Sequence, residues 1–179
     1  MDTLKDKVIG SWYGMAVGDA MGLTVRGLKP ETVRQLFRSV DGFKDVRPFL
    51  GKGIKRFKMQ GLYGSQTQSA LVVGDCLLKN KSGGVKEITE LLVQLSVGGP
   101  ESYFGVYRHP EGAFRQAVGS LMERSSLGGG QHNRPDAAFA AMGIPVGLLN
   151  RDRAETAIRL SVETGLLMSR NLCEVTGMA

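Results

Sequence analysis

The chain is 179 residues long, with 42% apolar and 22% charged residues, which is typical of a soluble protein with one domain, here 1–179. No apolar run approaches the roughly 20 residues of a membrane helix, the N-terminus lacks a signal-peptide profile, and the two cysteines lack CxxC spacing, which fits a reducing cytoplasm. The net charge of +6 favours anionic partners without indicating a fold.

The first predicted element is a helix that begins near residue 4. Apolar residues recur there at helical spacing, namely Leu4, Val8, Trp12, Met15 and Ala16. Three glycines on this stretch, Gly14, Gly18 and Gly22, stand four residues apart and therefore share one face. Each glycine costs about 1 kcal/mol in a helix interior relative to alanine. We therefore expect another backbone to approach this face closely.

Residues 27–60 are predicted to be mostly loop, with a short helix at 31–38 that begins near Pro30. The segment 44–58 combines cations with aromatic residues, a pattern that can track and stack a single-stranded nucleic acid. Asp41 and Asp45 dilute its charge, and no known nucleic-acid module surrounds it. We interpret it as a solvated loop and do not expect nucleic acid as a partner. Its residues are Lys44, Arg47, Lys52, Lys55, Arg56 and Lys58, with Phe43, Phe49 and Phe57.

A polar turn then leads into an apolar helix in the stretch GLYGSQTQSALVVGDCLL, residues 61–78. We expect the helix itself to run from 67 to 78. The turn supplies hydroxyls and amides without a carboxylate, imidazole or thiolate, through Ser65, Gln66, Thr67, Gln68 and Ser69. This helix entrance therefore lacks the ligand types that metal sites usually use.

Four further helical segments are predicted, at 86–97, 112–125, 137–142 and 151–173, of which the last is one long helix or two. Asp136 is a good N-cap for the third. The last carries a small-residue packing face that consists of Ala154, Ala157, Ile158, Ser161 and Gly165. Because few windows alternate with period two, we predict an all-α bundle.

Three isolated features carry weaker signals. A glycine run at 128–130, beside His132 and Arg134, can bring backbone amides to a phosphate, but it matches neither nucleotide fingerprint and is interpreted as a connector. His109 has no acidic neighbour in the sequence and is interpreted as a surface residue. Asp19 lies in an apolar, small-residue helix end, where a carboxylate needs hydrogen bonds or a cation. For Asp19, structural pairing and site chemistry both stay open.

Two stretches, and a weaker third, resemble the ADP-ribosylglycohydrolase family, whose enzymes release ADP-ribose from modified arginine or serine. GSWYGMAVGDAMGLTVR resembles the family's opening helix, with its G-x-x-x-G-D-A-x-G-x-x-x-E signature. GLYGSQTQSALVVGDCLL stands where the family has Y-T-D-D-T-Q-M, and AAMGIPVGLL is similar to G-N-G-x-x-M-R-x-x-P-x-G-L. The resemblance implies an orthogonal multi-helix bundle. It also implies two magnesium or manganese ions that activate water and hold the ribose.

The sequence departs from the family pattern at the positions that carry the metal chemistry. The family's Thr-Asp-Asp falls on Gly64, Ser65 and Gln66. The acidic residue that closes the first motif falls on Arg26, whose guanidinium has no acceptor and is always protonated. Because such ions want carboxylate oxygens, we predict no retained metal site and no cofactor. Asp19 is retained, at a position that the resemblance marks as structural rather than metal-ligating.

The later part of the chain also departs from the pattern. In the third segment the family's asparagine and its flanking glycines fall on Asp136, Ala137 and Ala138, and its arginine falls on Met142. The family's D-x-D-[ST] cluster, which completes both metal sites, does not occur before Ala179. We therefore expect a bundle that is incomplete at the C-terminus.

These departures predict an ADP-ribosylglycohydrolase-like protein without efficient hydrolase activity, either a pseudoenzyme or a truncated product. Its expected ligand is ADP-ribose, a related nucleotide or a protein partner, and no catalytic residue is assigned. The predicted ligand-binding residues are Asp19, Arg26, Ser65, Gln66 and Thr67. One alternative is an active hydrolase that removes ADP-ribose from protein side chains, with Asp19 or Asp136 as general base. Another is a structural protein whose uncovered apolar face recruits a partner or self-associates.

Overall fold

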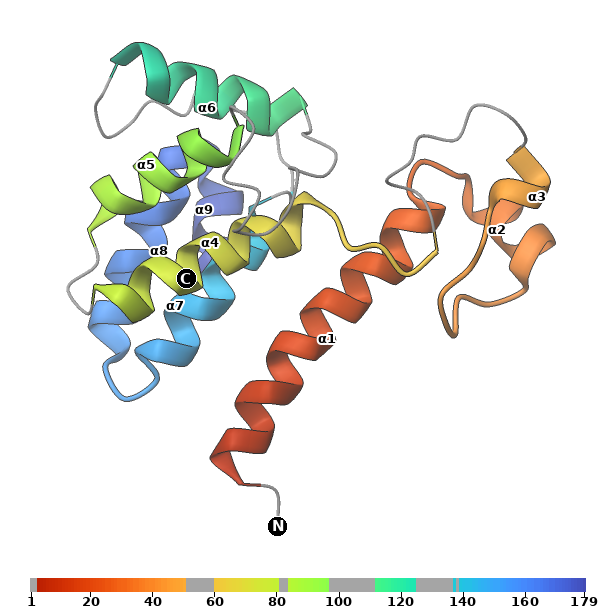
Figure 1. The fold of residues 1–179 in the computed structure, drawn as a ribbon, viewed down its shortest axis with the longest axis horizontal. Coiled ribbons are helices and arrows are strands. Elements are labelled where there is room, and N and C mark those ends of the chain that lie inside the picture. The colour runs from red at the N-terminus through yellow and green to blue at the C-terminus, as the bar shows by residue number, and fades with distance from the viewer. Residues whose placement is uncertain (1–2, 51–59, 81–83, 97–111, 125–136, 138) are drawn as a thin grey trace. The chain divides into compact units, whose positions relative to one another are not determined.

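The computed structural model describes residues 3–50, 60–80, 84–96, 112–124, 137 and 139–179 (Figure 1). It divides the chain into two compact units, Met1–Thr67 and Gln68–Ala179. All regular elements of the described residues are helices, so the predicted all-α fold is confirmed. The single domain that we predicted for 1–179 stays a prediction.

Unit 1 contains α1 (Leu4–Val25), α2 (Pro30–Phe37) and α3 (Arg47–Leu50). A capping box starts α1, because Oγ1 of Thr3 accepts a hydrogen bond from the Asp6 backbone N–H (3.2 Å) and the Asp6 carboxylate accepts one from the Thr3 backbone N–H (2.9 Å). The last turns of α1 bury one face of the helix around Leu23. α1 is therefore fixed at its start by its own cap and at its end by packing.

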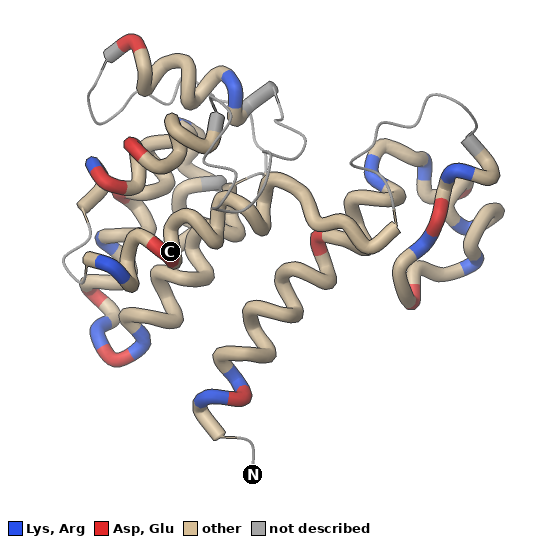
Figure 2. Tube along the Cα trace, in the orientation of Figure 1, with Lys and Arg blue, Asp and Glu red and all other residues tan. Residues whose placement is uncertain are grey.

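The glycine stripe on α1 does not meet another backbone among the described residues of unit 1. Apart from the nearby backbone of α1 itself, no described atom of unit 1 lies within 4 Å of the position that a Cβ would take at Gly14, Gly18 or Gly22. The neighbouring Tyr13 and Val17 are also exposed, and the middle of α1 carries no Lys, Arg, Asp or Glu (Figure 2). The close backbone approach that the spacing predicted is not found within unit 1, and for the rest of the chain it stays a prediction.

Unit 2 is a helical bundle with α8 at its centre. It takes up α4 (Ser65–Lys79) from Gln68 onward, and then α5 (Val85–Ser96), α6 (Gly112–Arg124), the 3₁₀ helix η2 (Ala140–Met142), α7 (Gly143–Leu149), α8 (Ala154–Met168) and α9 (Leu172–Met178). α8 packs against α5, α6, α7 and α9 (Figure 1). The core of unit 2 is apolar, and its largest fully buried side chains include Phe114, Phe139, Ile88, Leu92 and Leu167.

The predicted helices differ from the structure mainly at breaks in the chain. The helix expected at 137–142 is wrong, because only the 3₁₀ helix η2 forms there, and its proposed cap Asp136 lies outside the described residues. α7 was not predicted, since Gly143 and Pro145 resemble helix breakers. Pro145 is the third residue of α7, where a backbone N–H would have no partner within the helix. The segment 151–173 forms α8 and the start of α9, with a break after Met168.

α9 lies close to both α7 and α8. A Cβ at Gly143 on α7 would overlap the backbone carbonyl of Met178, and one at Gly165 on α8 would lie 3.3 Å from Cγ1 of Val175. Gly165 and Ser161 of the predicted small-residue face are buried, whereas Ile158 is exposed. Small side chains on two helices thus allow α9 to dock against the bundle.

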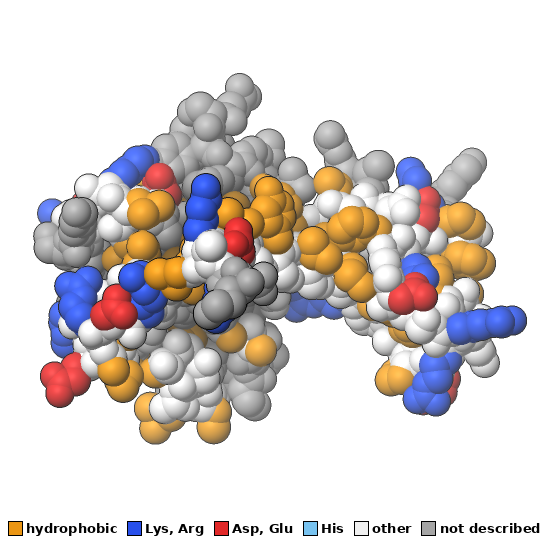
Figure 3. Space-filling model, turned by 90° about the horizontal axis from the view of Figure 1, so that it is seen from below, with side chains coloured by type: hydrophobic (Ala, Val, Ile, Leu, Met, Phe, Trp, Pro, Cys, Tyr) orange, Lys and Arg blue, Asp and Glu red, His pale blue; other side chains and the backbone are white. Residues whose placement is uncertain are grey.

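Acidic and basic side chains lie next to one another on the surfaces of both units (Figure 3). Lys44 pairs with Asp41 and Arg47 pairs with Asp45, each at 2.6 Å. Two cations of the basic segment 44–58 are therefore neutralised locally, and the other four lie outside the described residues. None of the described helices has the length and apolar character that crossing a membrane requires.

Candidate functional site

The carboxylate of Asp19 on α1 caps the N-terminal end of α4. Its Oδ2 accepts hydrogen bonds from the backbone N–H of Gly64 (2.8 Å), the backbone N–H of Thr67 (3.1 Å) and Oγ1 of Thr67 (2.7 Å). A helix leaves its first amides without partners and carries partial positive charge at this end. Gly64 precedes α4 and has no side chain, so Asp19 supplies the oxygen that an N-cap residue normally provides.

Gly64 also allows α1 and the start of α4 to approach each other. A Cβ at this position would lie 3.2 Å from Oδ1 of Asp19 and 3.3 Å from Cδ2 of Leu23. These distances are shorter than ordinary van der Waals contacts. Leu23 is buried and the other oxygen of Asp19 is held by hydrogen bonds, so neither neighbour can move away freely. The absence of a side chain at Gly64 therefore lets Asp19 stay close enough to cap α4.

The first turn of α4 brings Ser65, Gln66 and Thr67 together beside Asp19. Ser65 and Thr67 are buried and Gln66 is half-buried. With Asp19, these side chains provide oxygen atoms from one carboxylate, two hydroxyls and one amide. The backbone N–H groups of Ser65 and Gln66 make no hydrogen bond to another described residue. The turn thus presents free N–H donors as well as neutral oxygens.

Arg26 is the C-cap of α1. Its backbone N–H donates to the Leu23 carbonyl at 3.4 Å, and the residue is exposed. Arg26 therefore lies one residue beyond the C-terminal end of α1, the end nearer to Asp19. The predicted part of Arg26 in ligand binding stays a prediction.

Several residues that the sequence singled out lie outside the described part of the structure. They are His109, the glycine run at 128–130, His132, Arg134 and Asp136. Of the third segment, Ala137 and Met142 are described, and Met142 is fully buried. Met142 therefore packs in the core of unit 2.

The sequence model of the ADP-ribosylglycohydrolase family matches residues 1–175 of the chain. The chain belongs to this family. The family match runs from α1 into α9 and includes all five predicted ligand-binding residues. A comparison with curated proteins gives no match.

Within this family member, the structure shows one of the two roles that the sequence left open for Asp19, and its predicted part in ligand binding stays a prediction. The carboxylate is paired structurally, through three hydrogen bonds to the start of α4. Sequence reasoning missed Leu23 and the packing role of Gly64, which shape the contact. The local sequence carries no signal for it, because Asp19 lies 45 residues before Gly64.

Proposed function

We propose that this member of the ADP-ribosylglycohydrolase family binds ADP-ribose or a related nucleotide at the start of α4 without hydrolysing it efficiently. The observation that carries the proposal is the use of Asp19 as a helix cap, with three hydrogen bonds to its Oδ2. In the described residues, no three His, Cys, Asp or Glu side chains form a group that could hold a metal ion. Catalysis through a metal pair is therefore not assigned to this helix entrance.

The donors at this helix entrance do not fit a pair of divalent cations. Mg²⁺ and Mn²⁺ prefer carboxylate oxygens, whereas Ser65 and Gln66 offer neutral ones. The positive end of the α4 dipole also disfavours a cation, unless several anionic ligands compensate for it. Asp19 is a single carboxylate whose charge already serves the helix. This mismatch supports a loss of efficient hydrolysis.

The same features favour an anionic ligand. Backbone N–H groups at a helix N-terminus bind phosphate, and those of Ser65 and Gln66 are without a described partner, although the Asp19 carboxylate already offsets part of the helix dipole. In the proposal, Arg26 adds a charge-assisted contact to the ligand. The diphosphate of ADP-ribose is an anion of the appropriate kind. We therefore assign positioning to Asp19 and Thr67, and ligand contacts to Arg26, Ser65 and Gln66.

Calorimetry with ADP-ribose tests the proposal directly. We expect saturable binding that is the same in excess MnCl₂ and in a chelator, because no metal takes part. Arg26→Gln should weaken it about fivefold, in line with an exposed charged contact. Arg34→Gln, which removes an exposed arginine from α2, serves as the matched control and should have no effect. Binding that requires Mn²⁺, or no binding at all, contradicts the proposal.

A hydrolase assay on ADP-ribosylated arginine separates the proposal from its rivals. We expect no turnover above background with Mg²⁺ or Mn²⁺. Turnover that a chelator abolishes identifies an active hydrolase instead. If ADP-ribose does not bind and light scattering shows a dimer or larger species, a self-associating structural protein is favoured.

The free thiols of Cys76 and Cys173 support the proposed cytoplasmic location.

A further inference from the structure

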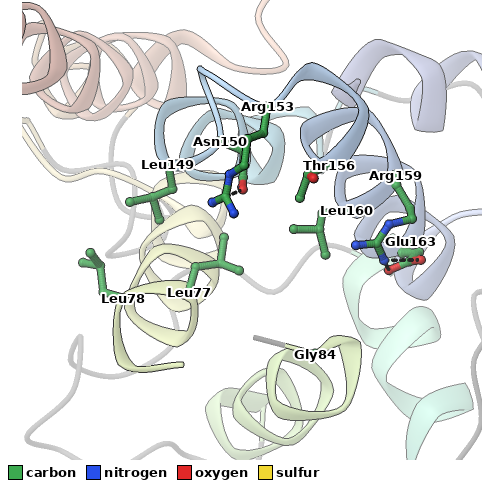
Figure 4. A pocket seen from close by; sticks show the side chains of 10 residues that line it. All are labelled: Leu77, Leu78, Gly84, Leu149, Asn150, Arg153, Thr156, Arg159, Leu160 and Glu163. Carbon is green, nitrogen blue, oxygen red and sulfur yellow. Dashed lines mark hydrogen bonds and ion pairs between the residues drawn. The ribbon is translucent and has the colours of Figure 1, made fainter. Parts of the chain in front are cut away.

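Unit 2 contains a pocket of about 700 Å³ on the side of the bundle where α4 ends (Figure 4). This volume lies within the range of about 300–1,000 Å³ that is typical of small-molecule sites. The pocket is bounded by the end of α4, the start of α5, the end of α7 and the stretch of α8 up to Glu163. Its lining consists of Leu77, Leu78, Gly84, Leu149, Asn150, Arg153, Thr156, Arg159, Leu160 and Glu163.

One part of the lining is apolar. Leu77 is buried and Leu160 packs against the core, so they form the inner surface. Leu149 is 38% exposed and lies at the mouth of the pocket with the more exposed Leu78. Figure 4 shows these leucines around one common space. An apolar group that enters this space would remove leucine surface from water, which is favourable.

The other part of the lining holds a cation in a fixed position. Asn150 is only 6% exposed, and its Nδ2 donates to the Val146 carbonyl at 2.9 Å. Its Oδ1 accepts from Nη2 of Arg153 at 3.0 Å, and its backbone carbonyl accepts from the Arg153 backbone N–H at 2.8 Å. The side chain of Asn150 therefore holds the guanidinium of Arg153, and its backbone carbonyl holds the Arg153 backbone. The remaining guanidinium donors can contact a ligand.

Arg153 and Arg159 differ in their charge partners. Arg159 forms an ion pair with Glu163 at 3.1 Å, so its charge is compensated within the pocket wall. Arg153 has no carboxylate partner among the described residues, because its guanidinium bonds only to the neutral Asn150. Glu87 lies beyond Gly84 and is not part of the lining. The pocket therefore combines an apolar floor with one uncompensated, oriented positive charge.

We propose that this pocket binds a small organic anion with an apolar body, whose carboxylate or phosphate contacts Arg153 and whose apolar part contacts Leu77, Leu149 and Leu160. A guanidinium is the preferred partner for both anions because it offers paired donors. The site involves none of the residues in the proposed nucleotide site at the start of α4. Either proposal can therefore fail without the other.

The test uses four probes that share one octyl chain, each below its micelle concentration, with the full chain in nuclear magnetic resonance titrations. They are octanoate, octyl phosphate, the neutral octyl glucoside and the cation octyltrimethylammonium. We expect both anions to shift the amide signals of Leu149, Arg153 and Leu160, and to bind about tenfold more tightly than the neutral probe. The cation should bind most weakly. The order of the two anions identifies the preferred head group.

Two variants and a control connect the binding to its cause. Arg153→Gln should weaken both anions about tenfold and leave octyl glucoside unchanged. Arg151→Gln, which removes an exposed arginine that is paired with Asp152 outside the lining, should change nothing. Leu149→Ser should weaken all four probes alike, and it keeps the test decisive if circular dichroism shows that Arg153→Gln misfolds. Equal binding of anion and cation, an unchanged affinity of Arg153→Gln for anions, or no shifts at these three residues would overturn the proposal.

Discussion

Asp19 and Thr67 are joined by two hydrogen bonds to one oxygen, because Oδ2 of Asp19 accepts from both the backbone N–H and the Oγ1 of Thr67. Thr67 is fully buried within the first turn of α4. The contact links residues 48 positions apart and directs the charge of Asp19 to the positive end of a helix. An oxygen in this arrangement stabilises the fold and is less available to other ligands.

The first prediction concerns this cap. Asp19→Ala should lower the free energy of unfolding by about 1–2 kcal/mol, the range for losing an N-cap side chain. Urea unfolding followed by circular dichroism measures the change. Asp41→Ala removes an exposed ion pair with Lys44 and should stay within about 0.5 kcal/mol of wild type. Equal losses from the two variants would show that the cap does not stabilise the chain.

The second prediction contrasts the same substitution at two glycines. Gly64→Ala should lower the free energy of unfolding by about 1 kcal/mol, because its Cβ meets Asp19 and Leu23. Gly18→Ala should raise it by about 0.5–1 kcal/mol, since α1 has space there and alanine is the better helix former. Thermal unfolding measures both. A destabilised Gly18→Ala variant would indicate that a backbone covers the glycine stripe after all.

Most of the helices could be predicted from the sequence because their apolar residues recur with helical period. The errors lie where local signals and tertiary contacts disagree. α4 begins two residues earlier than predicted because Asp19, distant in sequence, provides its cap. α7 forms in spite of Gly143 and Pro145, because Pro145 falls in the first turn and Gly143 fits against Met178. Neither partner can be identified from the local sequence.

The contact between Asp19 and Thr67 was indicated by the motifs in part only, and the ligand site itself stays a prediction. Motif similarity located Asp19 and the stretch at 65–67, and the structure places Asp19 against Thr67. The roles of Gly64 and Asn150 depend on contacts that appear only after folding. The pocket beside Arg153 combines α4, α7 and α8, so no single stretch of sequence indicated it.

The third prediction tests how closely α9 docks on α7. Gly143→Ala should lower the free energy of unfolding by about 1–3 kcal/mol, because its Cβ would overlap the backbone carbonyl of Met178, which a side-chain rotation cannot relieve. Gly147 lies on the exposed side of the same helix, and no described atom lies near the position that a Cβ would take there. Gly147→Ala should therefore be neutral or slightly stabilising. Thermal unfolding of both variants checks the difference. A tolerated Gly143→Ala would mean that α9 docks less closely than described.

The fourth prediction concerns the two thiols. Burial, reinforced by the charges of Glu87 and Asp75, raises the pKa of Cys76 above its ordinary value of 9.0, whereas Cys173 is exposed. A thiol reagent at pH 8 should therefore modify one thiol quickly in the native chain and two in urea. Because the pKa of Cys76 is raised in the folded state, its contribution to the free energy of unfolding is intact below pH 9.0. This contribution declines as the pH rises further. Rapid modification of both thiols in the native chain would contradict the buried position of Cys76.

The measurement that tests the central claim most directly is a Mn²⁺ titration of the intact chain, followed by electron paramagnetic resonance of the free ion. The capping role of Asp19 predicts no saturable binding by wild type in the micromolar range. The double variant Ser65→Asp with Gln66→Asp places two carboxylates at the same turn. Its affinity for Mn²⁺ should exceed that of wild type at least about tenfold. Two Mn²⁺ ions bound per wild-type chain at micromolar concentration, and released by Asp19→Asn, would contradict the account.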